Sequence, residues 1–403
     1  MALRALLTRS RFQGDAVVHR VVLNGRFLTQ VQTGVQRYAA ETLRALDTLL
    51  ADDAARLHGG LDFVLAVPAA APLKLELHAL NLRHIRVVAV PGGRGHLWEQ
   101  LALLRFARGA YLVNFNYSGP LLKRRQMVTV HDATVKVMPD SFTRGYRGLH
   151  NLMVAVLGRT AQDVMTVSAF SRDELARCFG LKRRDIVVGR EGGEHAVVAS
   201  HDGGTALADD ATVLRRHGLK AGQYILGVGS VKPNKNYALL GRAMGLLPHY
   251  PWPVAIAGAK DIGIFNDSAV LPQSFRFLGF VPDAELSALY RHAAWFVFPS
   301  LYEGFGLPAV EAMAHGCPVL AARAASIPEV CADAALYFDP HDPADLARTL
   351  QRVLDEPALR QTLAAPAALR LQRYNWRANA QILLEHVQGR VLGAPASRAL
   401  YGT

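Results

Sequence analysis

The amino-acid sequence predicts an α/β protein made of two facing, doubly wound domains with parallel sheets. Its 403 residues exceed what one ordinary hydrophobic core holds, so two domains are expected. Short β-rich runs alternate with longer segments of helical periodicity, which is typical of βα units. This alternation occurs on both sides of a stretch rich in Gly, Asp and Ala, a composition that suits a linker. We therefore expect one sheet before that stretch and another after it.

The strands are expected in two sets, with ligands at their carboxyl ends. The first set is 20–25, 62–67, 84–90, 111–115, 127–131, 164–168 and 186–189. The second set is 224–229, 253–257, 275–279, 295–299, 318–322 and 335–338. The resulting division is a loose leader (1–18), a first domain (19–200), a second domain (201–375) and a terminal helix (376–403) with an apolar face at Trp376, Ile382, Leu383 and Val387.

The formal net charge of +12 favours an anionic partner. Nucleic acid, a phosphorylated substrate and an acidic membrane surface all fit this charge, and so does a basic surface that is simply solvated. Because the basic residues are spread along the chain without an aromatic-interleaved stripe, nucleic acid is not expected. Anionic lipid and a phosphorylated substrate stay open.

The cysteines and the apolar runs bear on the compartment. Cys178, Cys317 and Cys331 are odd in number and lack metal-site spacing, which favours a reduced, cytoplasmic protein. No apolar run reaches the roughly 18 residues that a membrane-spanning helix needs. Three arginines interrupt the apolar cluster in the first 20 residues, unlike a secretory signal. We expect a cytoplasmic protein, with peripheral docking on the membrane left open.

The segment "FVFPSLYEGFGLPAVEAMAHGCPVLAA" (296–322) carries the strongest chemical signal. A strand leads into a glycine turn, Pro308 suits the first helical position, and Gly316 suits the helix end. Free N–H groups at the helix start favour a phosphate, whereas carboxylates favour hydroxyls. Glu303 and Glu311, on either side of the turn, therefore indicate a nucleotide sugar: Glu311 accepts from the ribose and Glu303 from the transferred sugar. In the alternative, Glu311 only stabilises its own helix and Glu303 is solvated.

Three further strand ends contribute candidates. Lys235 in "YILGVGSVKPNKN" could neutralise a diphosphate, or be an ordinary surface lysine. Gly34 at a helix entrance could bring N–H groups to the same phosphate, or be a plain turn glycine. His131 after "MVTV" could bond a sugar hydroxyl, or hold a backbone carbonyl.

Two other segments are expected to be mainly structural. In "TVSAFSRDELARCF", Ser171 and Glu174 have the spacing of a capping box, with Ser168 also preceding the helix. In "HLWEQLALLRFARG", Trp98, Leu101 and Leu104 form either a buried helix face or an acceptor or membrane face. No two aspartates are separated by one residue, so the usual carboxylate clamp for magnesium is missing, and no hydrolase or P-loop motif occurs.

These segments resemble the retaining glycosyltransferases of family 4, which have the GT-B architecture of two facing Rossmann-like domains. "SLYEGFGLPAVEAMAHGCPVLAA" is similar to the E-x7-E signature of that family. "GSVKPNKN" is similar to its "GTLEPRKN", "FLGFVPDAEL" to its "FLGYVSDEEL", and "VTVHDATVKVMPDSF" to its "VTIHDLSFLRFPEWF". The likeness covers roughly residues 20–390 and favours the mannosyl- or rhamnosyltransferase-like subset.

The resemblance implies a role for each matching position. Catalytic roles are expected for Glu303 and His131 at the sugar and for Lys235 at the diphosphate, and the backbone around Val281 is expected to meet the base. The full set expected to bind the donor is Gly34, Ser230, Lys235, Val281, Glu303, Gly304, Phe305, Gly306, Leu307 and Glu311. No metal or other cofactor is expected, and the terminal helix is expected to cross back to the first domain.

One departure concerns the diphosphate. Many family members have an arginine where this chain has Ser230, and another before the lysine where this chain has Asn234. Lys232 is a candidate to replace the missing charge.

The function implied is transfer of a hexose, with mannose from GDP-mannose as first choice, to a lipid-linked saccharide in surface polysaccharide biosynthesis. A rhamnosyl- or other hexosyltransferase using a dTDP- or UDP-sugar is the alternative within the class. A nucleotide-sugar epimerase and a silent sugar-nucleotide binding module are alternatives of other classes.

Overall fold

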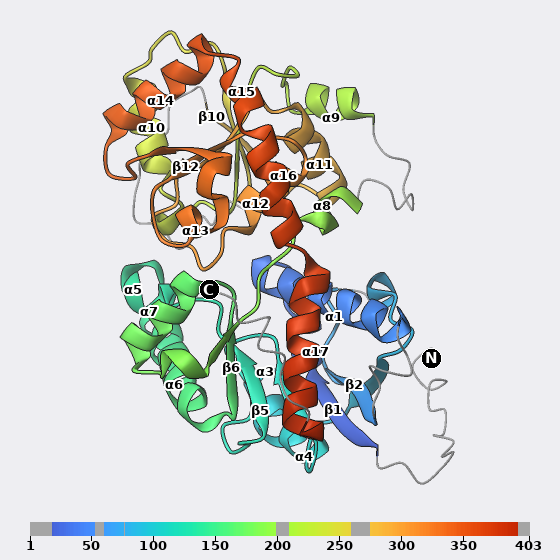
Figure 1. The fold of residues 1–403 in the computed structure, drawn as a ribbon. Helices are drawn as coiled ribbons and strands as arrows, with labels where there is room; N and C mark the ends of the chain where they lie inside the picture. Colours follow the sequence, from blue (N-terminus) through green and yellow to red (C-terminus); the bar gives the residue numbers. More distant parts are fainter. Residues whose placement is uncertain (1–17, 53–59, 76, 199–208, 259–274, 394–403) are drawn as a thin grey trace.

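The computed structural model describes residues 18–52, 60–75, 77–198, 209–258 and 275–393, and it contains two parallel sheets (Figure 1). Within these residues the first sheet has the order β3-β2-β1-β4-β5-β6-β7 and the second β10-β9-β8-β11-β12-β13. The strands are β1 (His19–Asn24), β2 (Leu61–Pro68), β3 (Arg86–Val90), β4 (Tyr111–Asn114), β5 (Gln126–Thr129), β6 (Asp163–Thr166), β7 (Ile186–Val188), β8 (Ile225–Val228), β9 (Val254–Ala257), β10 (Phe275–Gly279), β11 (Trp295–Phe298), β12 (Val319–Ala322) and β13 (Ala335–Phe338).

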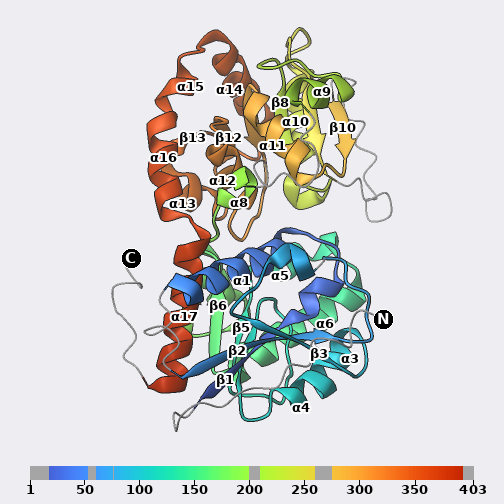
Figure 2. The same ribbon diagram turned by 90° about the vertical axis from the view of Figure 1, so that its right-hand side faces the viewer.

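Helices cover both faces of each sheet (Figure 2). They are α1 (Gly34–Asp52), α3 (Gly95–Trp98), α4 (Leu104–Phe106), α5 (Thr134–Val137), α6 (Arg144–Thr160), α7 (Ala169–Phe179), α8 (Glu194–Val198), α9 (Asp210–Arg216), α10 (Tyr237–Gly245), α11 (Asp283–His292), α12 (Leu307–Ala314), α13 (Ile327–Cys331), α14 (Pro343–Asp355), α15 (Leu359–Thr362), α16 (Ala364–Arg373) and α17 (Trp376–Leu392). None of the described helices is both long enough and apolar enough to cross a membrane.

The strands form where the sequence predicts them, because each is a continuous apolar run. Val21, Val22 and Leu23 of β1 are wholly buried, as are most central residues of the other inner strands. A parallel strand covered by helices on both faces needs such a run rather than an alternating pattern. The prediction of two doubly wound α/β domains is confirmed.

Each sheet has a point at which the strand order reverses, between β1 and β4 in the first and between β8 and β11 in the second. Ligands of doubly wound folds bind outside the carboxyl ends of the strands at this point. The two reversals therefore give the places where a site is expected.

Helix α17 joins the two halves of the molecule. It continues from α16 on the second sheet and lies along α1 of the first (Figures 1 and 2). Asn379 Nδ2 donates to Thr42 Oγ1 (2.9 Å), and Arg390 Nε donates to the buried Asp163 (2.9 Å). The predicted apolar face of this helix, from Trp376 to Val387, is buried. Most of the predicted leader and the predicted boundary at 200/201 lie outside the described residues.

Candidate functional site

Two charged side chains meet where the strand order of the second sheet reverses. Glu303 follows β11, and Lys235 ends a 3₁₀ turn that follows β8. Lys235 Nζ lies 2.6 Å from Glu303 Oε1, and the side chains are 16% and 14% exposed. The two loops are joined because the Leu301 N–H donates to the Asn234 carbonyl (2.8 Å). The structure thus places at one point the two side chains assigned to the diphosphate and to the sugar.

The glycine turn after Glu303 is held tightly on both sides. Ser326 Oγ lies 3.0 and 2.8 Å from the carbonyl oxygens of the residues before and after Gly304. A Cβ at Gly304 would lie 2.7 Å from the His131 carbonyl oxygen, so the turn touches the first domain. Gly306 has φ of 108°, and α12 starts directly after it, with no side-chain cap. These backbone approaches explain why glycine occupies both positions.

The start of α12 differs by one residue from the prediction. The helix begins at Leu307, so Pro308 takes the second helical position instead of the first. Pro is tolerated there because the first N–H groups of a helix have no partner within it. The predicted end is close, since Gly316 has φ of 67° just after the last helical residues.

Glu311 lies in α12 with its carboxylate already bonded. Its Oε2 accepts from the Tyr290 hydroxyl (3.1 Å), and its Oε1 lies 3.0 Å from His195 Nε2. Trp376 Nε1 donates to His195 Nδ1 (3.0 Å), and because indole is only a donor, the His195 proton must lie on Nε2 and point to Glu311. Burial alone would raise the pKa of Glu311, but His195 and Arg37 outweigh it and lower the pKa.

Glu311 is therefore a charged, buried group that links α12 to α8 and to the start of α17. Glu311 thus has a structural role, as in the alternative to ribose binding. It bonds to side chains of other elements, however, instead of stabilising its own helix. The expected ribose contact stays a prediction.

His131 holds a backbone carbonyl. Its Nε2 lies 3.1 Å from the Phe115 oxygen, its ring meets Tyr38 edge-on at 4.8 Å, and its Nδ1 lies 3.8 Å from Glu191. Burial raises the pKa of Glu191, and His131 offsets part of that rise. The structural alternative for His131 is thus the one observed, and its contact with a sugar stays a prediction.

The remaining residues predicted to bind the nucleotide-sugar donor lie on loops at the carboxyl ends of the strands or at a helix start. Gly34 is the exposed first residue of α1, and no atom lies within 4 Å of a Cβ built on it. Ser230 is half-buried just after β8. Phe305, Leu307 and Val281 have side chains in the core, so their backbone atoms are what a ligand could contact.

An ion pair between the domains joins the start of α1 to the start of α11. Arg37, in the first turn of α1, donates to both carboxylate oxygens of Asp283, the first residue of α11 (2.9 and 2.6 Å). An open cavity of about 500 Å³ adjoins this pair and is also lined by His195 and Trp376. Asp283 directly follows the backbone segment expected to meet the base, so this cavity borders the expected nucleotide position.

Helix α7 is capped in a way that the sequence did not predict. The Ser168 side chain is the cap, accepting from the Ser171 N–H, and Glu174 pairs with Arg177 instead of closing a capping box. Glu329 of the second domain accepts from the first two N–H groups of α7 (both 2.9 Å). The capping-box prediction was wrong because the helix starts three residues earlier than the box requires, with Ser168 rather than Ser171 as its N-cap.

The two serines at the start of α7 also contact the glycine turn that follows Glu303. The hydroxyls of Ser168 and Ser171 both donate to the Gly304 carbonyl oxygen (2.5 and 2.9 Å). Sequence reasoning missed this role, because two serines before a helix are ordinary capping residues and carry no sign of their partner.

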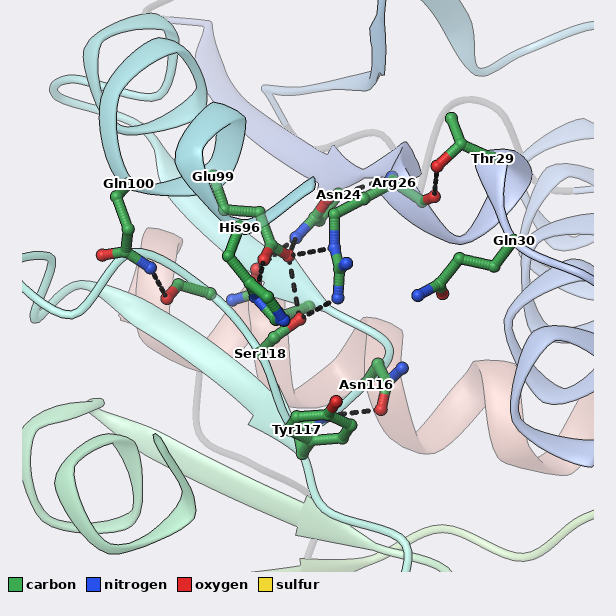
Figure 3. Close-up of polar contacts among 12 residues, drawn as sticks. Asn24, Arg26, Thr29, Gln30, His96, Glu99, Gln100, Asn116, Tyr117 and Ser118 are labelled. Carbon is green, nitrogen blue, oxygen red and sulfur yellow. Dashed lines mark hydrogen bonds and ion pairs between the residues drawn. The ribbon is translucent and has the colours of Figure 1, made fainter. Parts of the chain in front are cut away.

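A buried polar network occupies the strand-order reversal of the first sheet (Figure 3). Glu99 Oε1 accepts from Asn24 Nδ2 and Ser118 Oγ (both 2.9 Å) and pairs with Arg26 Nε (2.9 Å). Its Oε2 lies 3.0 Å from His96 Nδ1. Burial would raise the pKa of Glu99, but these partners lower it. Arg26 is thereby neutralised and fixed at the carboxyl end of β1.

The helix at 96–109 differs from both of its expected forms. Trp98 is wholly buried and donates through Nε1 to the Val90 carbonyl (3.1 Å), so it is not part of an exposed face. Leu101 is 63% exposed, and Leu104 is half-buried. The segment changes from α to π geometry at Glu99, which turns that carboxylate into the network.

Comparisons with known proteins show which enzymes this chain is similar to. Residues 212–370 match the family model described as glycosyl transferases group 1. The O-antigen chain mannosyltransferase B of Escherichia coli is 28% identical over 85% of this chain and 93% of its own length. The O-antigen chain mannosyltransferase RfbU of Salmonella typhimurium is 27% identical over 60% of this chain and 64% of its own. The structure of Anabaena HepE in complex with UDP and glucose superposes with a TM-score of 0.67 over 92% of this chain and 100% of that one, at 17% identity, which is a likeness of fold.

Proposed function

We propose, on the premise that this chain is a group 1 glycosyltransferase with the GT-B fold, that it transfers mannose from GDP-mannose to a saccharide acceptor. The acceptor belongs to a surface polysaccharide under assembly and is carried on a lipid. Two O-antigen mannosyltransferases among the relatives support mannose and the polysaccharide. The formal net charge of +12 supports an anionic carrier lipid and docking on an acidic membrane surface.

The observation that carries the proposal is the Lys235–Glu303 pair at the strand-order reversal. A diphosphate that enters beside Lys235 competes with Glu303 for the ammonium group, since charge-assisted bonds to phosphate are strong. Glu303 is then free to accept from the sugar hydroxyls. The uncapped start of α12 adds a favourable field for the phosphates.

Transfer then follows with retention at the anomeric carbon. The bond from the anomeric carbon to the diphosphate oxygen breaks, and the oxygen keeps the electron pair. The acceptor hydroxyl attacks the same face, and its proton passes to the leaving phosphate oxygen. Lys235 and the helix start stabilise the charge that develops on that oxygen.

No step of this scheme requires a metal ion, because the cation and the helix start supply the positive charge. We therefore expect the same rate with and without a chelator of divalent metals, and a strong loss of rate would contradict this part of the proposal.

The test is a thermal-shift panel of GDP-, UDP- and dTDP-sugars, because a ligand that binds the folded state raises its stability by mass action. GDP-mannose should give the largest rise. A rise only slightly smaller with Glu303→Gln and a much smaller one with Lys235→Met would agree with the separate roles of the two side chains. A larger rise with a UDP- or dTDP-sugar would instead favour the alternative donors.

Release of free GDP tests the class of reaction. A transferase releases GDP in step with an added acceptor. An epimerase converts the donor without any acceptor, and a silent binding module does neither. Turnover of the donor without acceptor, at a rate that acceptor does not change, would reject transfer.

A further inference from the structure

Four rings of the first domain lie together beyond the carboxyl ends of β4 and β5. Phe142 and Tyr146 stack at 5.6 Å, with 19° between the ring planes. His150 lies 5.8 Å from Tyr146 and 4.2 Å from Tyr117. Tyr117 follows β4 beside Ser118 of the polar network (Figure 3), and Tyr146 is 43% exposed. We call these four residues the aromatic shelf.

Asp132 links the shelf to the glycine turn that follows Glu303. A Cβ at Gly304 would lie 2.9 Å from Cβ of Asp132. The charge of Asp132 also acts on Tyr146, whose pKa is raised by burial first and then by Tyr117 and Asp132. Asp132 therefore touches the loop that follows Glu303 and lies within electrostatic reach of the shelf.

The charges that act on the shelf are partly compensated. Arg26 is a cation whose charge acts on Tyr146, and Glu99 compensates it through the 2.9 Å ion pair. Burial lowers the pKa of His150, so its ring is neutral at neutral pH. The half-buried Asp132 accepts from the Thr134 N–H through Oδ1 (2.7 Å). A ring with hydroxyl edges would find aromatic faces and polar tips here.

We propose that the aromatic shelf binds the terminal sugar of the acceptor as a neutral hexose ring, with its C–H face against Tyr146. A sugar ring has an apolar face and a polar rim, which match tyrosine rings with hydroxyl tips. The strand-order reversal of the first sheet, where ligands of this fold class bind, lies beside the shelf. This inference rests on the proposed transfer function and assigns to its acceptor a neutral sugar next to the reaction, with any charged carrier group farther away.

The first experiment measures sugar binding without any transfer. Methyl α-D-mannopyranoside is titrated into the full-length protein and followed by saturation-transfer NMR. Tyr146→Ala should weaken binding about fivefold to tenfold, from the loss of one ring contact, and Tyr146→Phe should change it less than about twofold. Leu152→Ala is the matched control, because Leu152 is on the same helix and is 57% exposed. Equal melting temperatures show that all three variants are folded.

The second experiment uses salt. Binding of a neutral ring should change less than about twofold between about 0.05 and about 0.5 M NaCl, since screening acts on charges. A mannoside affinity that is the same in Tyr146→Ala as in the parent, or no saturation transfer to the parent protein, would overturn the proposal. A steep loss of affinity with salt would also overturn it.

Failure of the shelf and failure of the proposed function give different results. Mannoside binding that depends on Tyr146, without any transfer by the parent protein, keeps the shelf and rejects the function. Transfer from a nucleotide sugar with an acceptor KM that Tyr146→Ala leaves unchanged keeps the function and rejects the shelf. If both hold, Tyr146→Ala raises the acceptor KM and leaves the donor KM unchanged.

Discussion

Replacing Glu311 by Ala tests whether this carboxylate is chiefly structural. The change removes the acceptor of the bonds from His195 (3.0 Å) and Tyr290 (3.1 Å). It strands the buried His195 N–H, while the Tyr290 hydroxyl keeps only a longer bond to the Pro308 carbonyl (3.3 Å). An unsatisfied buried polar group costs about 1–3 kcal/mol, so the free energy of unfolding should fall by at least about 1–3 kcal/mol. Tyr290→Phe, which removes one of the two bonds without stranding a donor, should cost about 1 kcal/mol.

The measurement is urea unfolding at neutral pH, followed by tryptophan fluorescence. Trp376 is a suitable reporter because it donates to His195 in the same chain of bonds. The reasoning is refuted if Glu311→Ala unfolds within about 0.5 kcal/mol of the parent while the affinity for the nucleotide falls more than about tenfold. That result would mean that Glu311 serves the ribose and little else.

The pH dependence gives a second check on Glu311. Its pKa is lowered from an ordinary value of 4.5, so the folded state favours the charged form. The stability that it contributes is present above pH 4.5 and is lost as the pH falls through the lower, folded pKa. The difference in stability between the parent and Glu311→Ala should therefore shrink below that pH, and a difference that grows there would contradict the assignment.

Three further predictions test other parts of the molecule. Glu303→Gln should lower transfer at least about a hundredfold and change nucleotide affinity only several-fold, measured by product formation and by titration calorimetry; near-normal transfer would reject its role. Glu191→Gln should raise the melting temperature at neutral pH. Burial raises the pKa of Glu191 above its ordinary value of 4.5. The stability that Glu191 contributes is therefore present below pH 4.5 and is lost as the pH rises through the higher pKa of the folded state. The advantage of Glu191→Gln should vanish under acid conditions, and a lower melting temperature at neutral pH would contradict it. Pelleting with anionic vesicles should decrease as salt increases, whereas salt-independent pelleting would indicate apolar contact instead.

The sequence predicts the fold well because the signal for it is local. Each strand is an unbroken run such as "WFVF" in β11, and helical segments separate these runs. The Lys235–Glu303 pair was predictable as two strand-end residues, since the doubly wound topology brings such ends together. What the sequence could not give is that the two side chains bond to each other.

The remaining site contacts depend on residues far apart in the chain. Glu311 is bonded to His195, 116 residues away, and α7 is capped by Glu329, 160 residues from the first N–H group that it accepts. Local patterns favoured a helix dipole for Glu311 and a capping box for Glu174. The explanation for Glu311 gave way to a distant partner, whereas Glu174 pairs with the nearby Arg177 because α7 starts earlier, after Ser168.

The Glu329 cap ties a helix of one domain to the position of the other domain. Glu329 accepts from the first two N–H groups of α7, which have no partner within that helix. A movement that withdrew Glu329 would leave these groups to water and would lose a charge-assisted interaction at the helix start. The same carboxylate therefore caps the helix and opposes separation of the domains.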